Sequence, residues 1–401
     1  MYFQGSEKIM KILSINAGSS SLKFTLFEMP EKLEIASGNF EKIGLEDSFY
    51  TIKYNGEKIG KEILVKDHEV AVSKLIDELI EMKIISSLDD IDGIGHRVVH
   101  GKDKYFDSVL ISDEVLEDIK SYSDLAPLHN PANILGIKAF MEVLPSVKNV
   151  AVFDTAFHQT IDKTKYIYPT PYSWYENYGI RKYGFHGTSH KYITKYLTEH
   201  MGRSDLKIIN CHLGNGGSLC AVDKGKSINT TMGFSPLSGI PMGTRSGDID
   251  PSIIPYIMSK TNMSLESVFN ELNKKSGLLG MSGISHDSRD IFSGIENGNE
   301  RCQLAEDIFA SRIASFIGSY YVELGGADVI SFTGGIGENA KEARRDIMKH
   351  LEVLGIKLDE TRNDVRGKFT LISTDDSKVE CYIVPTNEEL MIAIDAYDLI
   401  K

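Results

Sequence analysis

Two arginines and two acidic residues have the side chains and the surroundings to handle a phosphoryl group. Arg97 lies in the segment GHRVVHG and Arg245 in PMGTRSGDIDP, where small neighbours leave each guanidinium free to reach a ligand. Two planar guanidinium groups, each with paired N–H donors, can bind the oxygens of a phosphoryl group. Asp154 and Glu388 stand at the ends of expected elements, where a carboxylate can hold Mg²⁺ directly or through water. The alternatives are a salt bridge for each arginine and a surface cap for each acid.

A glycine and serine turn near the start of the chain has the composition of a phosphate-binding loop. In Lys11–Phe27 (KILSINAGSSSLKFTLF) an apolar run leads into the turn and a second run follows, which predicts a strand, a tight turn and a strand. The polar groups expected to face phosphate there are Asn16, Ser19, Ser20, Ser21 and Lys23. For a single turn of this kind, an ordinary hairpin is the alternative.

Two further glycine turns follow expected strands. Lys207–Val222 (KIINCHLGNGGSLCAV) repeats the strand, turn and strand pattern, and Ala327–Ala340 (ADVISFTGGIGENA) places a third turn after a strand. The first two segments share few identities, so they are weak evidence of a duplicated fold. They predict two similar domains that direct polar turns at a shared cleft.

The third turn also offers a rival interpretation. Gly335, Gly337 and Ala340 satisfy the dinucleotide pattern G-x-G-x-x-A after a strand, and Asp359 and Glu360 follow about 20 residues later. A dehydrogenase is therefore one alternative. Against it, the match lies near the end of the chain, with little room for the repeated parallel strand and helix units of that fold. A mononucleotide at the helix start stays open.

Two histidine pairs have the spacing of helical metal ligands. These are His96 with His100 and His186 with His190. No cysteine or carboxylate lies in register to complete a zinc site, so we do not favour one. The Gly-Thr that follows His186 instead predicts a histidine at a helix start, where it either bonds an anionic ligand or caps the helix.

The composition is that of a globular protein with two domains. The chain has 401 residues, of which 41% are hydrophobic and 25% charged. A net charge of −13 argues against nucleic-acid binding, and no apolar run reaches the roughly 18 residues of a membrane span. The four scattered cysteines fit a reducing compartment, so we expect a cytoplasmic protein that binds neither membrane nor nucleic acid.

The expected elements alternate strands with helices. Residues 33–40 and 49–65 are predicted strands, the latter folded at Asn55-Gly56, and a helix capped by Asp67 follows. Further predicted strands are 91–99, 147–153, 207–211 and 379–384, and further helices begin at Asn130 and Glu388 and cover 250–260, 264–275 and 300–324. Residues 169–183, rich in Tyr and Pro, are expected to cross between the domains.

Eight ordered segments carry a resemblance to a known family. They are NAGSSSLK (16–23), GHRVVHG (95–101), FDTAFH (153–158), YGFHGTSH (183–190), CHLGNGGS (211–218), MGTRSGDIDP (242–251), FTGGIGENA (332–340) and TNEEL (386–390). Over residues 10–401 the chain resembles the acetate kinase family, of the superfamily shared by actin, hexokinase and the Hsp70 ATPase domain. The resemblance implies an α/β, duplicated two-domain actin-like ATPase (ribonuclease H-like) fold with mixed sheets and a cleft between domains.

The resemblance also implies domain boundaries. Residues 1–9 are an N-terminal extension in which Tyr2–Ser6 (YFQGS) resembles the remnant of an engineered protease site. Residues 10–154 form the first actin-like domain, with 388–401 packing back on it. Residues 155–387 form the second, nucleotide-binding domain.

Site residues follow from the resemblance, residue by residue. The catalytic set is Asn16, Arg97, Asp154, His186 and Arg245, and Asn16 and Glu388 are tied to Mg²⁺, for which Mn²⁺ can substitute. Nucleotide binding is implied for Lys23, His212, Leu213, Gly214, Asn215, Gly216, Asp287, Ser288, Arg289, Gly335, Ile336, Gly337, Glu338 and Asn339, with Ser19 and Ser21 in the phosphate loop. Arg97, Val99, Leu128, Phe185 and Pro236 line the substrate pocket, although by residue type alone the last four belong to the core.

The implied reaction is reversible transfer of the ATP γ-phosphoryl group to acetate, giving acetyl phosphate and ADP. The implied assembly is a homodimer. Propionate or butyrate as acceptor is the alternative within the family, and a nucleotide-gated binding protein of the Hsp70 or actin type is the alternative from another class.

Overall fold

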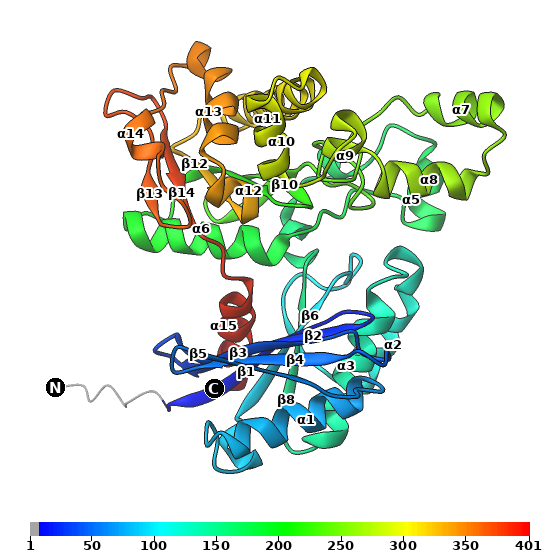
Figure 1. Ribbon diagram of the computed structural model, residues 1–401, viewed down its shortest axis with the longest axis vertical. Helices are drawn as coiled ribbons and strands as arrows, with labels where there is room; N and C mark the ends of the chain where they lie inside the picture. Colours follow the sequence, from blue (N-terminus) through cyan, green and yellow to red (C-terminus); the bar gives the residue numbers. More distant parts are fainter. Residues whose placement is uncertain (1–7) are drawn as a thin grey trace. The chain divides into compact units, whose positions relative to one another are not determined.

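Residues 8–401 are described by the computed structural model, and they divide into two compact units (Figure 1). The first unit comprises the described residues up to Phe157 together with Asn387–Lys401, and the second is His158–Thr386. The expected protease-site remnant at 2–6 lies outside the described residues. Residues 169–183 fall wholly within the second unit, so the expectation that they cross between domains is wrong. The chain passes between the units at 157–158 and again at 386–387.

The first unit is built on a mixed sheet. Its order is β5 (Glu57–Glu62), β4 (Phe49–Tyr54), β3 (Leu33–Glu41), β2 (Ser21–Met29), β1 (Met10–Ala17), β6 (Gly93–Val98), β8 (Lys148–Phe153) and β7 (Val109–Leu110). β1 pairs antiparallel with β2 and parallel with β6, and β6 pairs parallel with β8. The β4–β5 turn is at Asn55-Gly56 as predicted, because both residues adopt the positive φ that a tight hairpin requires.

The second unit repeats this plan. Its sheet order is β11 (Lys226–Thr230), β10 (Gly217–Asp223), β9 (Lys207–Leu213), β12 (Val329–Thr333), β14 (Glu380–Ile383) and β13 (Thr370–Leu371). β9 pairs antiparallel with β10 and parallel with β12, and β12 pairs parallel with β14. The central strands of both sheets thus follow the same order and directions, which bears out the duplication that two short segments only suggested.

Helices cover both sheets. In the first unit they are α1 (His68–Glu81), α2 (Asp113–Ser121), α3 (Asn130–Val143) and α15 (Glu388–Ile400). In the second they are α4 (Lys163–Tyr166), α5 (Tyr172–Tyr178), α6 (Gly187–Met201), α7 (Ile253–Thr261), α8 (Leu265–Lys274), α9 (Gly277–Ser282), α10 (Ser288–Glu296), α11 (Glu300–Leu324), α12 (Gly334–Asn339), α13 (Lys341–Lys349) and α14 (Glu360–Asn363). Within residues 8–401, no helix is both long and apolar enough to cross a membrane.

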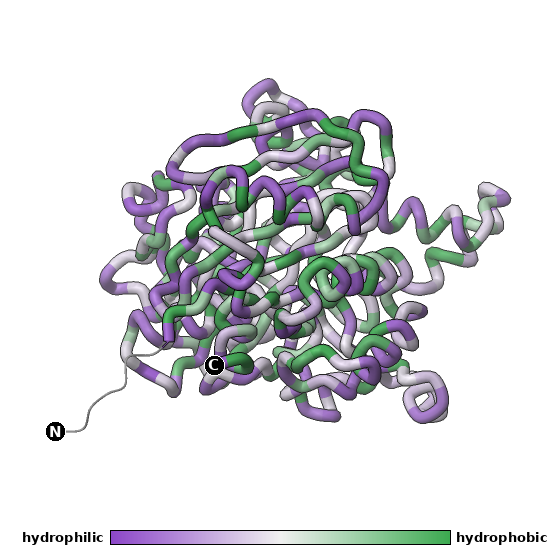
Figure 2. Tube along the Cα trace, turned by 90° about the horizontal axis from the view of Figure 1, so that it is seen from below, coloured by the Kyte–Doolittle hydropathy of each residue, from purple (hydrophilic) through white to green (hydrophobic). Residues whose placement is uncertain are grey.

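Side-chain caps fix several of these helix starts. Asp67 accepts from the Val70 amide at the start of α1, and Asn387 accepts from the Leu390 amide at the start of α15. Apolar and polar residues alternate over short stretches of the trace, as expected of elements with one buried face (Figure 2). The long helix α11 packs its buried face into the core of the second sheet, whereas α15 packs on β1, β6 and β8 of the first.

Candidate active site

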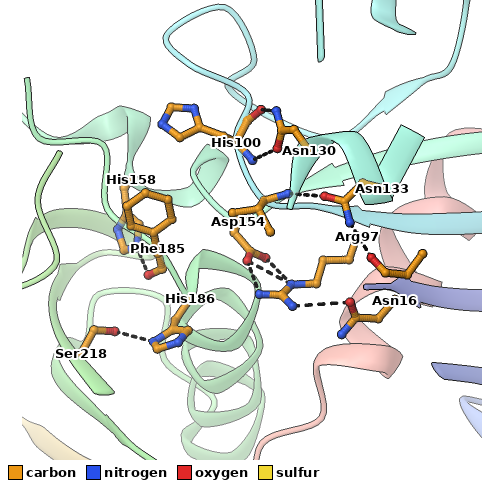
Figure 3. A network of polar contacts seen from close by, with 12 residues as sticks. Asn16, Arg97, His100, Asn130, Asn133, Asp154, His158, Phe185, His186 and Ser218 are labelled. Atoms are coloured by element: carbon orange, nitrogen blue, oxygen red, sulfur yellow. Dashed lines mark hydrogen bonds and ion pairs between the residues drawn. The ribbon is translucent and has the colours of Figure 1, made fainter. Parts of the chain in front are cut away.

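The first unit gathers the groups expected around phosphate at the ends of β1, β6 and β8 (Figure 3). Arg97 donates from Nε to Asp154 Oδ2 at 3.0 Å and from Nη2 to the same oxygen at 2.6 Å. Its Nη1 lies 3.5 Å from Asn16 Oδ1. Asp154 is 1% exposed, and its negative charge raises the pKa of Arg97 above the ordinary value. Arg97 is therefore held in one orientation by a buried carboxylate.

The glycine and serine turn lies beside these residues. Asn16 on β1 is directly opposite Lys23 on β2, and Lys23 forms an ion pair with Glu389. Ser19 and Ser21 are exposed, and the turn closes through a bond from the Gly18 amide to the Ser21 carbonyl at 2.8 Å. A groove of about 830 Å³ is lined by Asn16, Lys23, Arg97 and Val99 among others. The polar donors of the turn thus face solvent, where an anion can reach them.

Glu388, the first residue of α15, is a partly buried carboxylate. Burial raises its pKa to about 7, with Arg97 opposing the shift and Asp154 and Glu389 adding to it. Carboxylate and amide oxygens are the ligands that Mg²⁺ prefers. Within residues 8–401, no three His, Cys, Asp or Glu side chains form a metal-binding cluster. These groups fit an ion that is held by one or two protein oxygens and by substrate phosphates.

The second unit brings His186 and Arg245 to one place. A Cβ atom added to Gly216 would lie 3.3 Å from Arg245 Nη1 and 3.6 Å from His186 Nε2. His186 stands immediately before α6, as predicted, with the positive φ of 56°. Its ring lies over that of His212, with centroids 4.3 Å apart. A cation and an imidazole therefore share one side of the second glycine turn.

Arg245 differs from Arg97 in having no acidic partner among residues 8–401. Its Nη1 donates to the Pro236 carbonyl at 3.3 Å and lies 3.7 Å from Met242 Sδ. Asp248 and Asp250 are the nearby acids in the sequence, but neither forms a salt bridge with Arg245 in the described residues. Asp248 accepts from the Gly239 amide, and Asp250 accepts from the Ser252 amide. Burial lowers the pKa of Arg245 below its ordinary value. The loop of Arg245 is nevertheless fixed, since the Gly243 amide donates to the Asn215 carbonyl at 3.1 Å.

A cavity of about 670 Å³ in the second unit collects many of the expected nucleotide residues. The expected residues that line it are Gly214, Asn215, Asp287, Ser288, Arg289, Gly335, Ile336 and Asn339. Phe292, Glu296 and Arg366 also line it, although the sequence did not predict them. The other expected residues are not part of its lining, and they are Lys23, which belongs to the first unit, and His212, Leu213, Gly216, Gly337 and Glu338. The volume is in the range of small-molecule sites.

Glu338 has a local structural role instead. Its Oε1 accepts from the Gly334 amide at 2.9 Å and from the Thr386 amide at 3.1 Å, which joins the third glycine turn to the end of the second unit.

The four residues expected to line the acyl pocket differ in burial. Val99 is 5% exposed and Phe185 is 3% exposed, whereas Leu128 is 74% exposed. Assigning Leu128 to the core from its residue type is therefore wrong. Pro236 is partly buried, and its carbonyl holds Arg245.

Sequence reasoning missed the asparagines that hold the first site together. Asn133 on α3 accepts from the Val99 amide at 3.2 Å and donates to the Ala17 carbonyl at 2.8 Å (Figure 3). Asn130 accepts from the His100 amide and donates to its carbonyl. Only the Asn-Pro pair at the start of α3 marked this helix, and nothing in the sequence shows which strands the asparagines join.

The zinc alternative has no support. His96 lies 2.7 Å from Asn149 Oδ1, and burial lowers its pKa to about 4. His186 and His190 both contact the hydroxyl of Ser218.

Comparison with known proteins gives the family. A sequence model described as the acetokinase family matches residues 11–394. The chain belongs to the acetokinase family. It is 56% identical over 393 residues to the acetate kinase of Bacillus subtilis strain 168, which covers 98% of this chain and all of that relative.

Solved structures agree with this acetokinase assignment. A Porphyromonas gingivalis acetate kinase matches with a TM-score of 0.94 and 42% identity, covering 98% of this chain and 100% of that one. A propionate kinase from Francisella tularensis matches with a TM-score of 0.92 and 42% identity, covering 97% and 100%. These matches confirm the α/β, duplicated actin-like fold. As an acetokinase the chain is not a dehydrogenase, and β9, β12 and β14 alone give the second sheet its parallel pairs in the described residues.

Proposed function

We propose that the protein is an acetate kinase, which transfers the γ-phosphoryl group of ATP reversibly to acetate and forms acetyl phosphate and ADP. Its family membership and its similarity to the Bacillus subtilis acetate kinase support this assignment. The observation that carries it is the guanidinium of Arg245, which lies beside His186 without an acidic partner in the described residues. A partly buried cation of this kind is best stabilised by an anionic ligand.

Acetate needs no general base. A carboxylic acid with a pKa of about 4 to 5 is already ionised at neutral pH, so its oxygen can attack the γ-phosphorus directly. The task left to the protein is to neutralise the charge that repels the two anions and that spreads over the transferring group. His186 and Arg245 supply a donor and a cation for it. In this mechanism His186 is a hydrogen-bond donor to the phosphoryl oxygens.

Arg97 has a different part in the same reaction. Because Asp154 holds its Nε and Nη2, Arg97 approaches a ligand with the donors of Nη1, on the side of Asn16. This orientation suits binding of the acetate carboxylate or a phosphoryl oxygen. Asp154 is the residue that orients Arg97, and Lys23, Ser19 and Ser21 add donors at the neighbouring turn.

Asn16 and Glu388 would hold Mg²⁺, with Mn²⁺ as a substitute. The partly buried carboxylate of Glu388 supports this assignment, because its pKa is raised by desolvation and a cation offsets the cost of ionising it. When bound, the ion would neutralise phosphate charge. The nucleotide base and ribose are assigned to the cavity lined by Asp287, Ser288 and Arg289, where Arg289 holds the pKa of Asp287 down to about 2.

Propionate kinase is the second candidate. It is favoured by the Francisella propionate kinase, whose identity of 42% equals that of the Porphyromonas acetate kinase. Under this proposal, the preferred acyl chain length depends on how closely Val99, Leu128, Phe185 and Pro236 approach the acyl group.

Two further assignments belong to the proposal. A cytoplasmic location is supported by four free, buried cysteines in the described residues. A homodimer is inferred from the family, and light scattering coupled to gel filtration would test it against the chain mass of 44.6 kDa.

The test is an acyl phosphate assay. The protein is incubated with Mg-ATP and acetate, propionate or butyrate, and the acyl phosphate is trapped with hydroxylamine as the coloured hydroxamate. The strongest signal with acetate supports acetate kinase, and a signal only with longer acids supports the second candidate. No signal with any acid, although ATP binds, contradicts the kinase assignment.

A further inference from the structure

A buried serine joins the ring of His186 to a second imidazole. The hydroxyl oxygen of Ser218, on β10, lies 3.0 Å from His186 Nδ1 and 2.9 Å from His190 Nε2 (Figure 3 shows the first contact). Ser218 and His190 are fully buried. A serine hydroxyl carries one proton, so it can donate to only one of the two rings and must accept from the other.

The surroundings of His190 decide which ring donates. Burial lowers the pKa of His190 well below its ordinary value, and the nearby rings of His158 and His212 lower it further, so the ring is neutral with one proton. Its Nδ1 is buried and has no hydrogen-bond partner in the described residues. A proton on Nδ1 would be a buried, unpaired donor, whereas a proton on Nε2 is bonded to Ser218. His190 therefore donates from Nε2 to the Ser218 oxygen.

The direction of the second bond follows. With its oxygen accepting from His190, Ser218 directs its own proton to His186 Nδ1. A neutral His186 then carries its proton on Nε2, because the bond made by one ring nitrogen determines which nitrogen is protonated. The Nε2 edge is the one that faces Gly216 and Arg245.

We propose that His190 and Ser218 are positioning residues that fix His186 as the Nε2–H tautomer, so that it presents a donor beside Arg245 to the transferring phosphoryl group. The catalytic part of this inference rests on the proposed function, whereas the tautomer does not. The opposite tautomer would direct a bare nitrogen, an acceptor, at phosphoryl oxygens that are also acceptors.

The experiment compares two substitutions of His190 in the full-length protein. His190→Gln keeps an N–H donor near the position of Nε2, and His190→Leu removes it. Ser218→Ala removes the linking hydroxyl. The matched control is Ser331→Ala, which deletes another fully buried serine, on β12, that bonds Asn210 and no imidazole. The measurements are the imidazole ¹⁵N shifts of His186, assigned with His186→Asn, and the kinetic constants for acetyl phosphate formation.

The wild-type spectrum is expected to show His186 protonated on Nε2. In His190→Leu and Ser218→Ala the two nitrogen shifts should move toward each other, and kcat should fall about tenfold, as for loss of an outer partner of a ligating histidine. KM for ATP and acetate should change less than twofold. His190→Gln should keep the wild-type shifts and most of kcat, and Ser331→Ala should keep both.

Two results would overturn the inference. One is a wild-type His186 protonated on Nδ1, which needs no variant and no activity to detect. The other is a folded His190→Leu protein with unchanged His186 shifts and kcat. If the wild type makes no acyl phosphate but shows the Nε2–H tautomer that depends on His190, the proposed function fails and the tautomer assignment stands.

Discussion

The two units hold their buried charges in opposite ways, although their sheets share one plan. In the first, Arg97 is tied to the buried Asp154 by bonds from two of its nitrogens. In the second, the hydrogen bonds of the Arg245 side chain within the described residues go to a backbone carbonyl and a thioether and to no acid, and Glu306 is buried with one oxygen unpaired. Removing one partner of a buried ion pair destabilises the fold, because the other charge is left without its partner. A buried charge without a partner lowers the free energy of unfolding, so we expect to find one where a ligand binds it.

The largest effect on activity is expected from Arg245→Ala. Removing a donor aimed at developing charge costs about 10² to 10³ in kcat. Stability should be unchanged or slightly higher, because no buried carboxylate is left behind. Acetyl phosphate formation and urea unfolding of the same preparation measure the two quantities. A stable variant with nearly full kcat would show that the unpaired charge of Arg245 is not used.

Arg97→Ala should lower both activity and stability. It leaves Asp154 buried without its cation, which costs about 3 kcal/mol of unfolding free energy. Adding Asp154→Asn should restore most of this stability, since the remaining side chain is neutral, but should not restore activity. Unfolding curves of the single and double variants test this. Equal unfolding midpoints for wild type and Arg97→Ala would contradict the distinction between the two arginines.

Glu306→Gln tests a buried acid that has no proposed ligand and one oxygen without a hydrogen-bond partner in the described residues. Burial raises the pKa of Glu306 to about 8, above the roughly 4.5 of an exposed glutamate. The folded state therefore binds this proton more tightly, and stability falls as the pH rises from about 4.5 to about 8. The variant should gain up to a few kcal/mol over wild type at pH 9 and little at pH 5, with unchanged kcat.

The measurement for Glu306→Gln is the urea midpoint of both proteins from pH 5 to pH 9. A difference that does not vary with pH would mean that Glu306 is ionised in the folded protein throughout this range.

Gly216→Ala should have the smallest effect. The added methyl carbon lies 3.3 Å from Arg245 Nη1, so the guanidinium must shift by a few tenths of an ångström and kcat/KM should fall a few fold. Gly318→Ala is the control, because nothing lies within 4 Å of its added carbon in α11. It should stabilise the protein by about 1 kcal/mol and leave kinetics unchanged. Equal kinetics for both variants would contradict the placement of Arg245 beside Gly216.

Local elements could be predicted from sequence where a single signal fixes them. The apolar spacing of residues 300–324 gave both ends of α11, because a helix of that length is set by its own periodicity and caps. The prediction that the Tyr-rich segment 169–183 crosses between the units is wrong, because a high content of proline and tyrosine indicates irregular structure but does not indicate to which unit a segment belongs. It contains the short helix α5 and belongs to the second unit.

The site could be predicted in its residues but not in its pairings. The motifs supplied Arg97, Asp154 and Arg245, yet a salt bridge was an open alternative for both arginines. Only the fold shows that Arg97 has such a partner and that Arg245 has none among residues 8–401. Ser218 and His190 gave no separate signal, because a serine in a strand is common and the histidine spacing suggested a metal.

The central claim is one direct transfer from ATP to acetate, and the stereochemistry at phosphorus tests it most directly. ATP made chiral at the γ-phosphorus with oxygen isotopes is turned over with acetate, and the configuration of the acetyl phosphate is determined. The account predicts inversion, as one in-line displacement requires. Retention would mean two transfers through a phosphorylated residue such as Glu388 and would contradict it.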